Sequence, residues 1–219
     1  ALDSDGSLRW RLAEDVCRQG HADSIRPYRD AARAEDRRIL MTHCGGNRLS
    51  MLDGNGAIQW SVSGMHFESV FSGELDRELP GREIVVDIAH GPWGRQPLVV
   101  LDAEGRLLGR YVADDSRHHR LIDWFGTGED LIFIAQPLGL FDARGNRRAV
   151  FDAPMPPGAP DEKNVGQLEY MVHLADVTGN GRPDVVVNTS PGRAVWVYRN
   201  DQGAKNLSRD RLTMPENAT

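Results

Sequence analysis

The segment Leu52–Trp60, LDGNGAIQW, contains the motif that decides the fold. An apolar residue and an aspartate are followed by turn residues with a glycine and by a second extended run. A glycine here supplies the positive φ that a tight hairpin turn requires. The motif recurs as LDSDGSLRW at 2–10, LDAEGRLLG at 101–109 and FDARGNRRA at 141–149, and in degenerate form as VYRNDQGAK at 197–205. It therefore predicts a recurring β-hairpin.

Each of the four later copies is preceded by an apolar strand, and before that strand lies another short one that begins near a histidine. The repeating unit thus has four strands, A to D, at a period of about 40–50 residues, which is typical of β-propeller blades. We expect an all-β chain that forms one propeller domain or a fragment of a larger ring, with about four to five blades. The units are 1–20 (partial), 21–64, 65–115, 116–165 and 166–205.

Composition excludes some classes of partner. The chain has 219 residues, 26 Lys and Arg against 32 Asp and Glu, and a net charge of -6. This balance argues against a nucleic-acid partner, which would need a basic face. No apolar run is long enough for a membrane-spanning helix. The two cysteines, Cys17 and Cys44, are too few for a disulfide framework; they form either one bridge or two buried thiols.

The loop at 176–184, DVTGNGRPD, joins two apolar strands and is rich in glycine and in oxygen-bearing side chains. It is either a tight turn closed by hydrogen bonds from side chains to backbone N–H groups, or a small cation site. Its candidate metal ligands are Asp176, Thr178, Asn180 and Asp184. The segment DWFGTGED at 123–130 keeps the pair of glycines and is a poorer version of the same loop.

Histidines are expected to gather on one face, because D-to-A connections and B–C turns open on the same side of a propeller. His21, His66, His118, His119 and His173 belong to the first group, and His43 and His90 to the second. Histidine suits acid–base chemistry near neutral pH, although one that starts an inner strand is more often a structural residue. The candidate substrate-binding residues on this face are Arg95, Trp93, His66, His119 and His173.

Several of these segments resemble known repeat families. The loop at 176–184 resembles the calcium loop of FG-GAP/VCBS propeller repeats, with Thr178 and Asn180 where stronger sites carry acids. Together with VWVYRN at 195–200 and PLVVLDAEGRLL at 97–108, it resembles the propeller-fold polysaccharide lyases of the rhamnogalacturonan and rhamnose–glucuronate types. The resemblance covers roughly residues 20–200 and implies structural calcium and a uronic-acid-containing glycan as partner. We also expect a secreted or periplasmic location.

A lyase of this kind cleaves by β-elimination, which needs a base, an acid and a positive charge opposite the uronate carboxylate. We assign His43 and His90 as base and acid, Arg26 or Arg95 as the neutralising charge, and Tyr28 as a reserve proton donor. Two alternatives stay open at this point. The chain is either a non-catalytic propeller module that binds a glycan or a protein, or an architectural part of a larger enzyme that supplies further blades.

Overall fold

The structure is a computed structural model of the chain, and it describes residues 1–12, 20–29, 37–89, 96–113, 119–135, 138–151, 169–190 and 195–201. These residues form strands and turns without a helix, so the prediction of an all-β chain is confirmed. None of them forms a helix that is long and apolar enough to cross a membrane.

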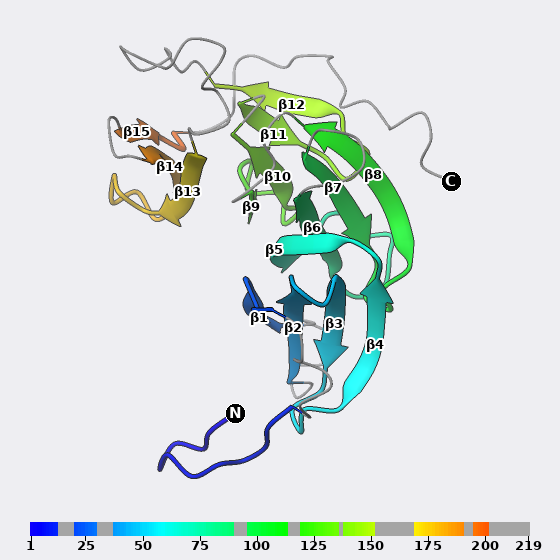
Figure 1. The fold of residues 1–219 in the computed structure, drawn as a ribbon. Coiled ribbons are helices and arrows are strands. Elements are labelled where there is room, and N and C mark those ends of the chain that lie inside the picture. Colours follow the sequence, from blue (N-terminus) through cyan, green and yellow to red (C-terminus); the bar gives the residue numbers. More distant parts are fainter. Residues whose placement is uncertain are drawn as a thin grey trace. The chain divides into compact units, whose positions relative to one another are not determined.

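The described strands form four antiparallel sheets in which neighbours in sequence are neighbours in space (Figure 1). The first sheet contains β1 (Ile25–Tyr28), β2 (Arg38–His43), β3 (Arg48–Leu52) and β4 (Ile58–Ser63). The second contains β5 (His66–Gly73), β6 (Glu83–Ala89), β7 (Gln96–Leu101) and β8 (Leu107–Ala113). The third contains β9 (Arg120–Ile122), β10 (Leu131–Ile134), β11 (Gly139–Phe141) and β12 (Arg147–Val150). The fourth contains β13 (Glu169–Ala175), β14 (Asp184–Ser190) and β15 (Val195–Tyr198). Each sheet falls within one of the sequence units expected from the repeat.

The chain divides into two compact units, residues 1–110 and 111–219, and each has its own hydrophobic core. Middle strands are buried on both faces: every residue of β6 and of β10 is buried. Outer strands such as β4 and β15 alternate between partly buried and exposed residues. This difference explains why the middle strands are continuous apolar runs in the sequence.

The repeated hairpins share one set of hydrogen bonds. In the hairpin after β3, Asp53 N–H donates to the Ala57 carbonyl at 2.9 Å and Gly56 N–H donates to the Asp53 carbonyl at 3.1 Å. Asp53 Oδ1 also accepts the N–H groups of Asn55 and Ala57. The same four bonds recur around Asp102 and Asp142. The aspartate recurs in these hairpins because its carboxylate accepts the N–H groups that close the turn.

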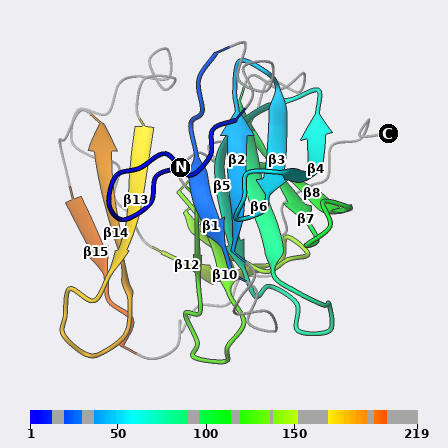
Figure 2. The same ribbon diagram turned by 90° about the horizontal axis from the view of Figure 1, so that it is seen from below.

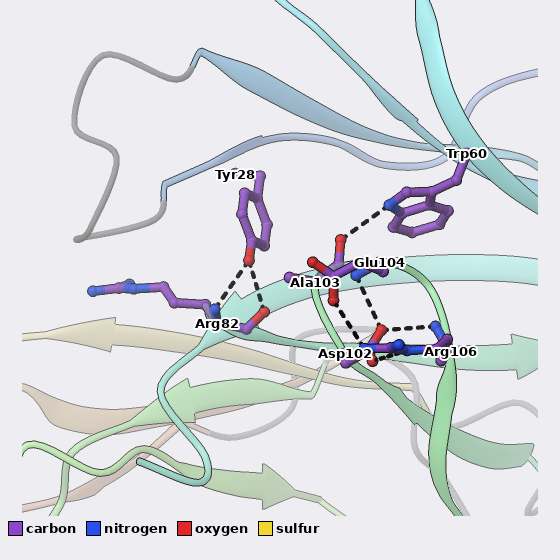
Figure 3. Close-up of polar contacts among 7 residues, drawn as sticks. All are labelled: Tyr28, Trp60, Arg82, Asp102, Ala103, Glu104 and Arg106. Atoms are coloured by element: carbon purple, nitrogen blue, oxygen red, sulfur yellow. Dashed lines mark hydrogen bonds and ion pairs between the residues drawn. The ribbon is translucent and has the colours of Figure 1, made fainter. Parts of the chain in front are cut away.

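The hairpin glycine has a second role that the repeat alone does not reveal. Trp60, in β4, donates its indole N–H to the Ala103 carbonyl at 3.0 Å, so its ring covers the next hairpin (Figure 3). A Cβ added at Gly105 would lie 2.8 Å from Trp60 Cε3. Trp10 covers Gly56 in the same way, with its indole N–H on the Gly54 carbonyl at 2.9 Å. Equivalent contacts in the second unit join Tyr111 to Ala143 and Gly145. In three successive repeats an aromatic residue thus covers the hairpin of the following repeat.

Candidate functional site

One edge of the first unit brings together three segments that are distant in sequence: the residues before β1, the end of β2 and the start of β5 (Figures 1 and 2). Thr42, in β2, holds them in place. Its hydroxyl donates to the Glu68 carbonyl at 2.8 Å and accepts the Ser24 N–H at 2.9 Å. The backbone pairing continues before β1, where Cys44 N–H donates to the His21 carbonyl at 3.0 Å. This edge is where the sequence predicts histidines to meet.

Five side chains with metal-ligating or titratable groups meet at this edge, and we call them the strand-start cluster. His21 Nε2 lies 2.9 Å from Asp23 Oδ1, and His66 Nε2 lies 3.2 Å from Glu68 Oε1. Cys44 Sγ contacts the Asp23 carboxylate and lies 2.8 Å from the Phe67 carbonyl oxygen. The donor atoms form two triads that share Asp23, and within each triad they lie within 4.8 Å of one another. The cluster comprises His21, Asp23, Cys44, His66 and Glu68.

Cys44 is a free and fully buried thiol. Of the two alternatives for the cysteines, the structure therefore supports the unbridged one for Cys44, while Cys17 lies outside the described residues. Burial, followed by the hydrogen bond and negative charge of Asp23, raises the pKa of the Cys44 thiol to about 12. This cysteine is consequently a protonated thiol at neutral pH.

His43, the predicted base, ends β2 and is 4% exposed. Burial lowers the pKa of its imidazole, and the charge of Arg48, opposite it in the β2–β3 register, lowers it further. The imidazole is therefore neutral at pH 7. Its Nε2 has no hydrogen-bond partner among the described residues, which is unusual for a buried polar atom.

Tyr28 and Arg26 both lie in β1 but have different surroundings. The Tyr28 hydroxyl donates to the Arg82 carbonyl at 2.9 Å and accepts the Arg82 N–H at 3.0 Å (Figure 3). Tyr28 thus fastens β1 to the segment before β6, and we assign its hydroxyl a structural role. Arg26 is exposed, and its guanidinium lies over the Phe71 ring at 4.9 Å. An exposed, stacked guanidinium is available to bind a carboxylate.

Replacing Tyr28 with phenylalanine checks this role. We expect the variant to keep the fold and to lose about 1–3 kcal/mol of the free energy of unfolding, because the Arg82 N–H and C=O lose a shared partner. Urea unfolding followed by tryptophan fluorescence measures the change. A stability equal to that of the wild type would show that these two bonds contribute nothing.

The other candidate residues are spread over both units. His66 starts β5 and belongs to the strand-start cluster. His119 is fully buried in the second unit. His173 lies within β13, beyond its start, because that strand begins at Glu169; its Nε2 is 3.2 Å from Asn188 Oδ1. It is therefore nearer to the loop at 176–183 than to the connection that precedes β13. The remaining candidates, His90, Trp93, Arg95 and His118, lie outside the described residues.

The loop predicted to hold calcium is closed by hydrogen bonds. Asp176 accepts the N–H groups of Asn180 at 3.0 Å and Gly181 at 2.8 Å. Asp184 is fully buried and accepts the N–H groups of Val177, Thr178 and Asn200. The hydroxyl of Thr178 donates to Asp184 at 3.1 Å, and Asn180 Oδ1 accepts the Arg182 N–H at 2.9 Å. All four predicted ligands therefore have hydrogen-bond partners within the loop and its flanks, as expected for a tight turn closed by side-chain hydrogen bonds. Calcium binding at this loop stays a prediction.

The loop at 123–130 has the same construction, as the sequence indicates. The Asp123 carboxylate accepts the N–H groups of Thr127 and Gly128, the same offsets as in the Asp176 loop. Gly126 and Gly128 have φ of 69° and 81°, and Gly179 and Gly181 have φ of 71° and 80°. Shared turn geometry thus accounts for the shared glycines.

Sequence reasoning missed three members of the strand-start cluster: Asp23, Cys44 and Glu68. A signal for two of them is present, because a histidine, one residue and an acid recur near the start of the repeats 21–64 and 65–115: His21-Ala-Asp23 and His66-Phe-Glu68. In both segments the imidazole lies beside the carboxylate two residues further on, at 2.9 Å and 3.2 Å.

Comparison with known proteins adds no family to this description. No protein-family model matches the chain, and no curated protein matches it in sequence.

Proposed function

We propose that the four sheets are blades of a β-propeller. Three observations support the proposal. The sheets are sequential antiparallel meanders, and the last hairpins of the first three sheets share the same hydrogen bonds. Trp60 in β4 and Tyr111 in β8, each within the last strand of its sheet, cover the hairpin of the following repeat. In a propeller the first strands of successive blades surround a central channel. The strand-start cluster and Arg26 would then lie near one mouth of that channel.

We propose that this edge cleaves a uronic-acid-containing glycan by β-elimination. The observation that carries the proposal is the convergence of two histidines from separate segments: His21 and His66 each belong to a triad that contains Asp23. That His90 joins them is part of the proposal, because His90 lies outside the described residues. Such an edge can supply both a proton acceptor and a proton donor to one sugar ring.

The reaction sets the role of each group. A base removes the proton on C5, the electron pair forms the C4=C5 double bond, and the C4–O4 bond breaks. The departing O4 takes a proton from an acid. In this proposal His43 and His90 are the base and the acid, and the exposed Arg26 neutralises the uronate carboxylate. The Nε2 of His43 lacks a hydrogen-bond partner among the described residues but is buried, so it could act as the base only once the neighbouring side chains move aside.

The test follows the unsaturated product by its ultraviolet absorbance on a panel of uronate-containing polysaccharides. We expect His43→Ala, His90→Ala and Arg26→Ala each to reduce kcat/KM by about 100-fold or more. Glu104→Gln, an exposed carboxylate in a hairpin of the same unit, is the matched control and should retain wild-type activity. His43 is buried, so circular dichroism must first show that its variant folds.

Two results would overturn the proposal. One is full turnover in both histidine variants. The other is a wild-type chain that binds an acidic glycan and forms no unsaturated product, which would instead identify a non-catalytic binding module.

A further inference from the structure

We propose that His21, Asp23 and Cys44 form a site for a divalent transition metal ion, of which Zn²⁺ is the representative. Their donor atoms lie within 4.8 Å of one another. Zinc bonds of about 2.0–2.3 Å to nitrogen, oxygen and sulfur place neighbouring ligands roughly 3.3–3.8 Å apart in a tetrahedron. Small side-chain movements would therefore bring the three atoms to a common ion.

The type of donor decides which ion the site would take. A thiolate and an imidazole are ligands for zinc, cobalt or iron, whereas calcium and magnesium prefer sites built from oxygen alone. This separates the strand-start cluster from the loop at 176–184, whose predicted ligands are all oxygens.

The contacts around Cys44 favour a cation. Its thiol has one proton, yet the Asp23 carboxylate and the Phe67 carbonyl oxygen both approach Sγ. Among the described residues, no arginine or lysine pairs with Asp23; its partners are His21 and Cys44. The Asp23 carboxylate, Cys44 Sγ and the Phe67 carbonyl oxygen thus lie close together, and no lysine or arginine of the described segments pairs with Asp23. A bound cation would interact favourably with all of these electron-rich atoms. Binding would release the thiol proton to solvent.

The three ligands would be held by backbone structure. Cys44 N–H donates to the His21 carbonyl at 3.0 Å, and Thr42 N–H donates to the Ser24 carbonyl at 3.0 Å. These bonds fix the segment before β1 against the end of β2. The second triad, Asp23 with His66 and Glu68, lies alongside and shares a ligand with the first.

The fourth position would be open to an exchangeable ligand, since the side chain of His21 is 69% exposed. Three protein ligands with an open position are typical of zinc sites that bind a substrate. If the proposed lyase activity holds, the open position would accept the uronate carboxylate oxygen and so help to neutralise it. That extension rests on the proposed function, whereas metal binding itself does not.

The experiment measures metal binding by the full chain without a histidine tag and without any glycan. We expect isothermal titration calorimetry to show one Zn²⁺ per chain, with a rise in Tm on addition of zinc. The Co²⁺ complex should show a thiolate-to-cobalt charge-transfer band in the near ultraviolet. His21→Ala, Asp23→Asn and Cys44→Ser should each weaken zinc binding roughly 100-fold or more, since even the loss of an outer partner costs 10–100-fold. Glu104→Gln should bind as the wild type does.

Unchanged zinc affinity in His21→Ala and Asp23→Asn, or a cobalt complex without the thiolate band, would overturn the inference. His21 is exposed, so its variant remains informative if Cys44→Ser does not fold. The two proposals fail separately. Zinc binding with no product on any glycan would contradict only the lyase, and product formation by a chain that binds no zinc would contradict only the metal site.

Discussion

Gly105→Ala is expected to lower the free energy of unfolding by about 3–5 kcal/mol. The glycine has a φ of +79°, where a side chain costs about 1–2 kcal/mol. Its Cβ would also lie 2.8 Å from the Trp60 ring, and overpacking costs a further 1–3 kcal/mol or so. To relieve the clash, the indole must give up its bond to the Ala103 carbonyl. Chemical denaturation of the purified variant measures the loss.

The chain contains a matched control for this prediction. Gly6 has the same place in the first hairpin and a φ of +84°, but a Cβ there would meet nothing within 4 Å. Gly179, with a φ of +71°, is equally open. We expect alanine at either position to cost at most about 1–2 kcal/mol, the effect of φ alone.

A double-mutant cycle isolates the aromatic contact. In a Trp60→Ala background the ring is absent, so Gly105→Ala should cost only what Gly6→Ala costs. Additive effects of Trp60→Ala and Gly105→Ala would mean that the ring and the glycine do not interact.

Asp184→Ala is expected to lower the free energy of unfolding by about 3–5 kcal/mol. The carboxylate is fully buried and accepts three backbone N–H groups and the Thr178 hydroxyl, and its removal leaves these donors without an acceptor. Asp176→Ala is the control. Its carboxylate is exposed and accepts two N–H groups that water can reach, so we expect a loss of about 1 kcal/mol.

The stabilisation by Asp184 should depend on pH. Burial raises the pKa of its carboxyl, but the hydrogen bonds from Asn200, Thr178 and Val177 outweigh this effect, and the net result is a lowered pKa. A carboxyl whose pKa is lower in the folded state stabilises the protein above the unfolded pKa of about 4, and this contribution is lost as the pH falls through the folded value. Tm should therefore fall below about pH 4, and less steeply in Asp184→Asn.

Calcium can be tested in the same measurement. If hydrogen bonds alone close the loop, adding calcium or a chelator leaves the wild-type Tm unchanged. A rise in Tm with calcium that disappears in Asp176→Ala would instead confirm the calcium prediction.

For the candidate site, the sequence indicated the edge and left open which side chains meet there. The repeat register placed the end of β2 and the start of β5 on one side, and the structure has His43 and His66 there. Cys44 and Glu68 could not be found in this way. The proximity of Cys44 to Asp23 depends on the pairing of β1 with β2, and that of Glu68 depends on how the first two sheets pack. The same holds for Tyr28: its sequence context suits a polar channel, whereas in three dimensions its hydroxyl meets the backbone of Arg82.

The sequence by itself determined the all-β class, the four-strand period and the hairpins, because turn chemistry and the alternation of apolar residues are local properties of the chain. Tertiary structure decided the second role of the hairpin glycines, the hydrogen-bonded closure of the loop at 176–184 and the membership of the strand-start cluster. Each of these depends on side chains that come from different repeats or from different strands of one sheet. Such distances are set by register and by contacts between sheets, which no local pattern records.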